Sequence, residues 1–109
     1  MNNPFLILNT SCGQILIDTT TIVRVKASSN YSKIYFSDNT ILVTTKLLKW
    51  FEKKLDEQYF IRLNRSHLVN NLFFKANQFV ENGIVLQNGD FIQIARRRKK
   101  NILNQLQAA

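Results

Sequence analysis

The sequence predicts a mainly β fold with two short helices. Short apolar runs separated by turn dipeptides occupy most of the chain, and only two segments have helical spacing. The chain has 109 residues, of which 45% are hydrophobic and 11% aromatic. That length fits a single domain over residues 1–109, and that content supplies a core without disulfides or bound metal.

About eight short strands follow from the apolar runs and the turns between them. We expect strands near residues 5–8, 14–17, 22–27, 31–37, 40–44, 61–63, 84–86 and 91–94. The turns are marked by Cys12-Gly13, Ser28-Ser29-Asn30, Asp38-Asn39, Asn82-Gly83 and Asn88-Gly89. In the third strand, strict alternation predicts Ile22, Arg24 and Lys26 on one side and the intervening residues on the other.

Helical spacing occurs in two segments. The first predicts an amphipathic helix at about 45–57, N-capped by Thr44 or Thr45. Its apolar face consists of Leu47, Leu48, Phe51 and Leu55. The second segment, from Ala95 to Leu106, predicts a short C-terminal helix with a basic first half.

The charge balance indicates an anionic partner. Fifteen Lys and Arg against seven Asp and Glu give a formal net charge of +8 and a sequence pI near 10, which is typical of nucleic-acid binders. No apolar run approaches the roughly 20 residues that span a bilayer, and the run over 5–8 is too short for a signal peptide. We therefore expect a cytoplasmic protein that does not bind membranes.

Catalytic chemistry is poorly represented. The chain has one histidine, His67, and one cysteine, Cys12, which lie far apart in the sequence. No HExxH, CxxC, GxSxG or Walker-type segment occurs. We expect no enzyme activity, no cofactor and no metal, and we interpret Cys12 as a half-buried residue near a turn.

The segment Tyr59–Asn70 concentrates the polar chemistry of the chain. Its apolar residues bracket a polar bend that contains Arg62, Asn64, Arg65, Ser66 and His67. Arg can engage guanine and Asn adenine with two hydrogen bonds, and Ser suits phosphate. A surface bend whose side chains satisfy the local backbone explains the same composition equally well.

Four segments, in their order along the chain, resemble the LytTR family. The family pattern I-x-x-I-x-A…Y is similar to Ile22–Ala27 followed by Asn30-Tyr31. The family signature F-x-R-x-H-R/K-S-Y/F-L/I-V-N is similar to Phe60-Ile61-Arg62-Leu63-Asn64-Arg65-Ser66-His67-Leu68-Val69-Asn70. The family ending L-x-N-G…V-S-R-R is similar to Leu86-Gln87-Asn88-Gly89 and Ile94-Ala95-Arg96-Arg97. Departures from these patterns are Asn64 for His, His67 for an aromatic residue and Ala95 for Ser.

The resemblance implies an elongated set of small antiparallel sheets whose loops, rather than a recognition helix, enter successive major grooves of DNA. By position, it implies base contacts from Tyr31, Arg65 and Arg97, and the two arginines suit guanine. The implied contacts with the DNA backbone come from Lys33, Lys46, Asn64, Ser66, Arg96, Arg98 and Lys99. We expect His67 to be a packed, hydrogen-bonded side chain rather than a DNA contact.

We therefore expect a bacterial transcriptional regulator of the response-regulator effector type, which binds double-stranded DNA at paired direct repeats. A homodimer on DNA and a regulatory partner protein are compatible with this expectation. Two other classes fit the charge as well. One is an RNA-binding basic β domain, for which exposed stacking aromatics such as Tyr31 and Tyr35 would be the distinguishing feature, and the other is a module that docks an acidic protein.

Overall fold

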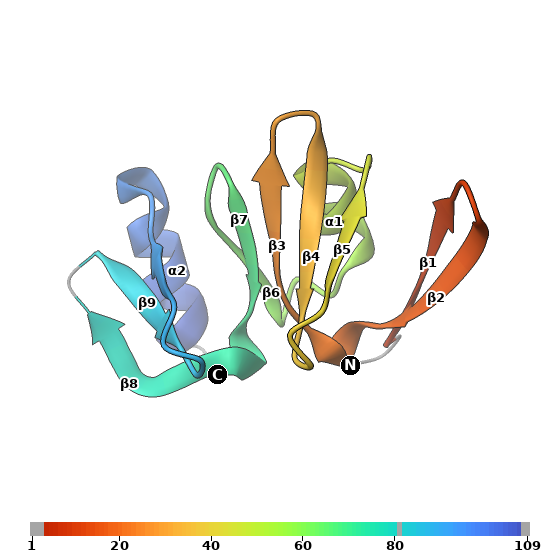
Figure 1. Cartoon of the computed structure of the whole chain (residues 1–109). Coiled ribbons are helices and arrows are strands. Elements are labelled where there is room, and N and C mark those ends of the chain that lie inside the picture. Colours follow the sequence, from red (N-terminus) through yellow and green to blue (C-terminus); the bar gives the residue numbers. More distant parts are fainter. Residues whose placement is uncertain (1–3, 81, 108–109) are drawn as a thin grey trace.

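The structure, a computed structural model, describes residues 4–80 and 82–107. It has the predicted mainly β architecture, with three small antiparallel sheets that lie side by side and two α-helices (Figure 1). Its extents of 42 × 30 × 24 Å make it elongated, as the resemblance implied.

The central sheet has five strands in the order β5-β4-β3-β7-β6. They are β3 (Ile22–Ser28), β4 (Tyr31–Phe36), β5 (Ile41–Thr44), β6 (Phe60–Asn64) and β7 (His67–Asn70). A two-stranded sheet consists of β1 (Phe5–Thr10) and β2 (Gly13–Asp18). A three-stranded sheet of order β10-β9-β8 consists of β8 (Phe74–Val80), β9 (Gly83–Leu86) and β10 (Phe91–Gln93). Two 3-10 turns, Thr19–Thr21 and Asn71–Phe73, connect the sheets.

The internal helix is shorter than predicted. Helix α1 spans Leu48–Lys54, against the expected 45–57. Leu47 occupies the N-cap position with an extended backbone, whereas the Thr44 hydroxyl accepts a hydrogen bond from the Lys46 amide (3.2 Å), so the predicted threonine cap is wrong. Because the helix begins after it, Leu47 lies off the apolar face and is 56% exposed.

The C-terminal run divides into two elements. Arg96–Arg98 form a 3-10 turn, and helix α2 then spans Lys99–Gln107. Ile102 is 3% exposed and packs into the core, while the cations at the start of the helix are partly or fully exposed. The predicted amphipathic helix with a basic first half is therefore confirmed, with a tighter first turn.

The turn between β1 and β2 leaves Cys12 exposed, whereas the sequence analysis expected it half-buried. The hairpin packs only one face inward, and its turn extends away from the rest of the chain (Figure 1), so the thiol is left in solvent. Gly13 in this turn has a φ of +114°, a backbone conformation that favours glycine.

A β-bulge in β3 lets the central sheet contribute to two cores. The pairing with β4 shifts between Ile22 and Arg24, which inserts Val23 as an extra residue. Ile22 therefore joins Val25 in one core, while Val23 joins the other. The predicted placement of Ile22 beside Arg24 and Lys26 is wrong, because the bulge reverses the alternation at this point.

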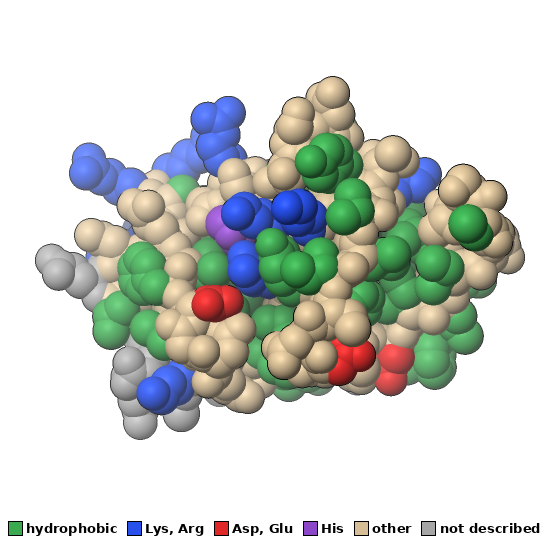
Figure 2. Space-filling view, viewed as in Figure 1, with side chains coloured by type: hydrophobic (Ala, Val, Ile, Leu, Met, Phe, Trp, Pro, Cys, Tyr) green, Lys and Arg blue, Asp and Glu red, His purple; other side chains and the backbone are tan. Residues whose placement is uncertain are grey.

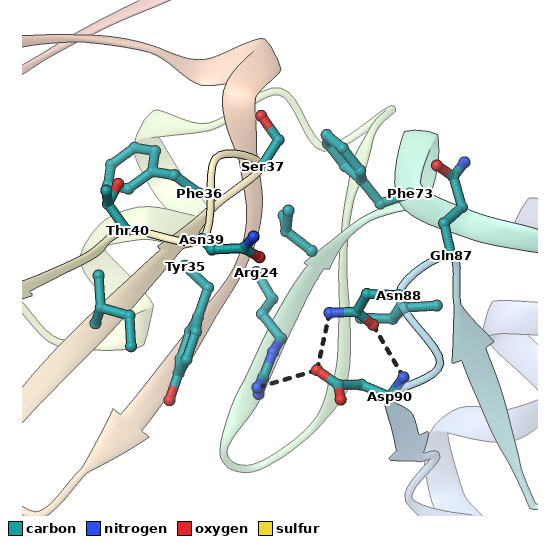
Figure 3. Close-up of a pocket in the computed structure, with 13 residues that line it drawn as sticks. Arg24, Tyr35, Phe36, Ser37, Asn39, Thr40, Phe73, Gln87, Asn88 and Asp90 are labelled. Carbon is teal, nitrogen blue, oxygen red and sulfur yellow. Dashed lines mark hydrogen bonds and ion pairs between the residues drawn. The ribbon is translucent and has the colours of Figure 1, made fainter.

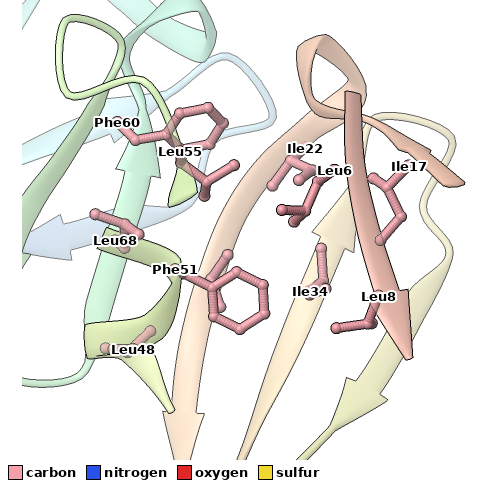
Figure 4. Packing of buried hydrophobic residues seen from close by; sticks show 11 residues of the cluster. Leu6, Leu8, Ile17, Ile22, Ile34, Leu48, Phe51, Leu55, Phe60 and Leu68 are labelled. Carbon is pink, nitrogen blue, oxygen red and sulfur yellow. The ribbon is translucent and has the colours of Figure 1, made fainter. Parts of the chain in front are cut away.

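The two cores lie on opposite faces of the central sheet. In the first, α1 and the β1–β2 hairpin pack on the sheet around Phe51, which is fully buried (Figure 4). In the second, β9, β10 and α2 pack on β6 and β7 through residues such as Leu63, Val69 and Leu86. The flanking elements are thus held against the central sheet, which sets the relative positions of their loops.

Phe51 provides a test of the first core. Replacing it with Ala should lower the free energy of unfolding by about 3–5 kcal/mol, because the lost aromatic ring leaves a cavity in a packed interior. Urea unfolding measures this change. The matched control is Leu47→Ala, which should stay within about 0.5 kcal/mol because Leu47 is exposed. Equal losses in the two variants would contradict this placement of the helix.

Candidate nucleic-acid interface

Three connections lie at the same end of the molecule. They are the β3–β4 turn at 29–30, the β6–β7 turn at 65–66 and the 3-10 turn Arg96–Arg98, all at the upper end in Figure 1. The three implied base-contact residues belong to these connections or begin the strand that follows. Distant parts of the sequence therefore present their polar residues along one edge.

Asn64 holds the β6–β7 turn in shape and ties it to the neighbouring sheet. Its Nδ2 donates to the Gln93 carbonyl at 2.6 Å, and its Oδ1 accepts from the Ser66 amide at 2.8 Å. The same Oδ1 lies 3.1 Å from Nδ1 of His67. The side chain that the sequence analysis expected at the DNA backbone is thus occupied by contacts within the protein.

Arg62 also stabilises the β6–β7 turn, through hydrogen bonds to its backbone. Its Nε donates to the Asn64 carbonyl and its Nη2 to the Arg65 carbonyl, both at 2.7 Å. Its Nη1 pairs with the carboxylate of Glu52 on α1. A guanidinium presents several donors in one rigid plane, so a single side chain can hold two successive carbonyls and a carboxylate. Arg65 is therefore presented on a turn with a fixed backbone.

Backbone hydrogen bonds link the β6–β7 turn to the connections on either side. The Ala27 amide of β3 donates to the Ser66 carbonyl at 2.8 Å. The Ala95 amide, just before the 3-10 turn, donates to the Leu63 carbonyl at 2.9 Å. These bonds make the middle connection the point of attachment for the other two.

A groove runs between the β6–β7 turn on one side and β10 with the 3-10 turn Arg96–Arg98 on the other. Arg65 and Arg97 are exposed and both line it, so the fold brings two of the three implied base-contact residues to one hollow. The other lining residues are Asn64, Ser66, His67, Phe91, Ile92, Gln93, Ala95 and Arg98.

The other predicted residues considered next lie outside this groove. Tyr31 is 37% exposed at the start of β4. Arg96 and Lys99 line a separate hollow beside the first turn of α2. Lys46 precedes α1, and its ammonium lies 5.3 Å from the centre of the Trp50 ring. The predicted contacts therefore form one shared groove with outlying cations rather than a single cluster.

A row of basic and polar side chains crosses the central sheet. Lys33 lies opposite Lys26, and Lys26 lies opposite His67. Directly opposite residues share a face, and like charges in such pairs repel. Among the described residues, neither lysine has a carboxylate within salt-bridge distance. An anion bound along this row would relieve a repulsion that the folded chain otherwise carries.

On the face shown in Figure 2, basic and acidic side chains are unevenly distributed. In Figure 2 most of the visible Lys and Arg side chains lie in the upper half, while the visible Asp and Glu side chains lie in the lower half. Two of the carboxylates, Asp38 and Asp90, belong to the β4–β5 and β9–β10 turns. A hydrogen bond from the Thr40 hydroxyl, with a second from its amide, lowers the pKa of Asp38. On this face, the upper part of the molecule therefore carries more basic than acidic side chains.

Arg24 joins the central sheet to the three-stranded sheet. Its guanidinium lies 4.0 Å from the centre of the Tyr35 ring and 3.6 Å from the carboxylate of Asp90 (Figure 3). Asn88 donates to that carboxylate at 3.0 Å and accepts from the Asp90 amide at 2.9 Å. The guanidinium occupies one face of the Tyr35 ring, so of the two candidate stacking aromatics Tyr31 is the more exposed.

His67 is held in its neutral form. Burial lowers the pKa of His67 to about 4, with further lowering by the charges of Arg24 and then Lys26. The ring is half-buried and hydrogen-bonded to Asn64. This confirms the packed, hydrogen-bonded side chain. That His67 makes no contact with DNA stays a prediction.

Comparison with known proteins identifies the family. The model of the LytTr DNA-binding domain matches residues 13–107 of this chain. The chain belongs to the LytTR family. A solved structure with the same fold is the LytTr DNA-binding domain of a putative methyl-accepting/DNA response regulator from Bacillus cereus. It has a TM-score of 0.77 and 20% sequence identity, and the match covers 95% of this chain and 97% of that one. No curated protein matches this chain.

The matched family is one of DNA-binding domains, so this LytTR domain is a DNA-binding domain. The groove that Arg65 and Arg97 line carries positive charge of the kind that an anionic ligand requires. Of the residues that the structure describes, none belongs to a helix long and apolar enough to cross a membrane.

The sequence analysis missed two features of this candidate interface, Lys26 and the contact between Asn64 and Gln93. Lys26 was available as a candidate, because the alternation of β3 already separated it from the apolar positions. The contact between Asn64 and Gln93 had no such signal, since 29 residues separate them and only the packing of two sheets brings them together.

Asn64→Ala tests the role of this side chain as the support of the β6–β7 turn. The variant should exchange the Ser66 amide hydrogen faster and lose about 1–2 kcal/mol of unfolding free energy, because three hydrogen bonds are removed. Amide exchange measured by NMR reports the first effect. Asn88→Ala, which changes an Asn of the β9–β10 turn, should leave the Ser66 amide unaffected. An unchanged exchange rate in Asn64→Ala would show that the turn holds its shape without the amide.

His67 should make stability depend on pH below neutrality. Its folded pKa of about 4 lies below the ordinary value of 6.5, so between these values the unfolded chain binds a proton that the folded chain does not. The free energy of unfolding should therefore fall as the pH drops from 6.5 toward 4, by less than about 1.4 kcal/mol per pH unit for this one proton. Urea unfolding across this range should show a smaller fall for His67→Phe. Hydrogen bonds lower the pKa values of Asp18 and Asp38 from 3.8, so any loss of stability from protonation of these carboxylates occurs at lower pH than the His67 effect.

Proposed function

We propose that this LytTR domain regulates transcription by sequence-specific binding to double-stranded DNA, which it reads in the major groove through loops. The observation that carries the proposal is the groove that Arg65 and Arg97 share. The two arginines come from different connections, and hydrogen bonds through Asn64 and Ala95 hold those connections together. Discrimination between bases requires side chains held at a defined spacing, and this arrangement supplies it.

Base contacts in this proposal come from Arg65, Arg97 and Tyr31. Each arginine can donate two hydrogen bonds to O6 and N7 of guanine. Tyr31 is exposed at the first position of β4, beside the β3–β4 turn, where its ring or hydroxyl can meet a thymine methyl or a phosphate.

Contacts with the DNA backbone supply most of the affinity and its dependence on salt, because bound cations release counterions from the phosphates. We assign this role to Lys33, Lys46, Ser66, Arg96, Arg98 and Lys99. Lys26 joins them, because it lies between Lys33 and His67 in the row across the sheet. Asn64, whose amide is already engaged, acts by positioning the turn.

A regulator of this kind acts in the cytoplasm, on the chromosome. The similar Bacillus cereus domain comes from a putative response regulator, and we propose an equivalent effector role for this chain. Paired direct repeats would bind two copies side by side, either as independent monomers or as a homodimer on DNA. A regulatory partner protein is a further way to control it.

Selection of binding sites from random duplex DNA tests the proposal directly. At about physiological salt, where non-specific binding is weak, the pure domain should enrich a short sequence element, repeated where two copies bind. Retention of all duplexes alike, or of none, would refute the sequence-specific function. Binding to single-stranded RNA or to an acidic protein would then account for the basic surface.

The two groups of contacts should respond differently to substitution. Arg65→Ala and Arg97→Ala should each cost about 1–3 kcal/mol on the selected site and relax one base position. Lys99→Ala should instead weaken binding to all sequences alike and reduce the slope of log K against log salt by about 1. Fluorescence anisotropy on the selected duplex and on a scrambled duplex separates these outcomes. Uniform weakening by the arginine variants would show that they contact phosphates rather than bases.

A further inference from the structure

The orientation of the Asn64 amide is determined by two partners of known polarity. The Ser66 backbone amide can only donate, so the atom 2.8 Å from it is the amide oxygen. The Gln93 carbonyl can only accept, so the atom 2.6 Å from it is the amide nitrogen. Both contacts assign the same orientation, with Oδ1 directed at His67.

That orientation determines which nitrogen of His67 carries the proton. Nδ1 lies 3.1 Å from Asn64 Oδ1, and an amide oxygen can only accept, so Nδ1 is the donor. In a neutral imidazole the other nitrogen, Nε2, then has no proton and presents a lone pair.

The surroundings of His67 keep it from gaining a second proton. Lys26 lies opposite it in the sheet, Arg24 is the next cation along β3, and both charges disfavour an imidazolium. Arg65 and Arg97 line the same groove as His67 and add further positive charge. Among the described residues, the two carboxylates in ion pairs, Asp90 and Glu52, are each held by an arginine. The ring is therefore a neutral group within a cationic surface.

A neutral His67 adds a capacity that the cations around it lack. Lys and Arg only donate hydrogen bonds, so they can engage phosphates and the acceptors of guanine or thymine. They cannot engage the amino groups that cytosine and adenine present in the major groove, which need an acceptor. His67 lines the same groove as the two arginines, so its ring lies beside the proposed base contacts. The proposal that follows replaces the sequence-based expectation that His67 makes no DNA contact.

We propose that His67 is a specificity-determining residue whose Nε2 accepts a hydrogen bond from an exocyclic amino group in the major groove, N4 of cytosine or N6 of adenine. The inference rests on the proposed function, because it assigns one base position of the same DNA site. Since His67 follows Arg65 by two residues on a rigid turn, this position adjoins the one that Arg65 reads. Asn64 is the positioning residue, because it fixes the proton on Nδ1.

The test removes the amino group from the DNA. In the selected site, cytosine is replaced by 2-pyrimidinone, which lacks the 4-amino group, or adenine by unsubstituted purine, which lacks the 6-amino group, one position at a time. At one position beside that read by Arg65, the replacement should weaken binding of the natural domain by about fivefold, the effect of one hydrogen bond. The base that responds distinguishes cytosine from adenine. The same replacement outside the selected site is the control for weakened base pairing.

The matched protein variant is His67→Phe, which keeps a flat ring of similar size without an acceptor. It should lose the same factor of about five on the natural site and show no further loss on the amino-deleted site, because both changes remove one interaction. Thermal unfolding checks that the variant folds. His67→Gln, which keeps an acceptor oxygen, should retain part of the discrimination.

Three results would overturn the inference. If the affinity losses from His67→Phe and from deletion of the amino group were additive, His67 would read no amino group. Unchanged base preference of His67→Phe at every position would show the same. A loss on all duplexes alike, with affinity rising as the pH is lowered from 7.5 to about 5.5, would show that a protonated His67 contacts phosphate. If the natural domain selected a sequence and Arg65→Ala relaxed it, only the assignment of His67 would fall. If the domain selected no sequence, the proposed function would fall with it.

Discussion

The arrangement of this surface depends on the three hydrogen bonds that the Asn64 side chain makes. One bond shapes the β6–β7 turn, one reaches the carbonyl of Gln93 on another sheet, and one orients His67. Because a primary amide donates and accepts at opposite atoms, it can join a donor and an acceptor from different elements. The position of Arg65 relative to Arg97 follows from this link and from the Ala95–Leu63 backbone bond.

The central sheet makes such a link possible because it is packed on both faces. A strand with regular alternation would have placed both Ile22 and Val23 on the wrong face of the sheet for the core that each joins. The bulge at Val23 resolves this conflict, so that β3 contributes Ile22 and Val25 to one core and Val23 to the other. The three-stranded sheet and α2 can then pack on the central sheet closely enough for the β6–β7 turn and the 3-10 turn Arg96–Arg98 to line one groove.

Some of the basic residues reduce the stability of the free domain. Lys26 and Lys33 lie opposite each other, and the cations around His67 oppose its protonation. These repulsions reduce the stability of the free domain and are relieved when an anion binds. The Arg24 contact with Tyr35 and Asp90 is different, because it pairs a largely buried guanidinium and holds two sheets together. Basic residues that are alike in the sequence thus have different roles in the fold, because Arg24 stabilises the packing of two sheets whereas Lys26 and Lys33 repel each other.

The sequence by itself determined the mainly β class, the turns, the two helical segments, the basic character and, through the signature around Arg65, the family. These features are local, since they depend on alternation, turn dipeptides and composition, which a short window contains. Only the tertiary structure decided the start of α1, the bulge at Val23, the joining of Arg65 and Arg97 in one groove and the proton on Nδ1 of His67. Each of these depends on contacts between residues that are distant in the chain, and such contacts form only when the sheets pack.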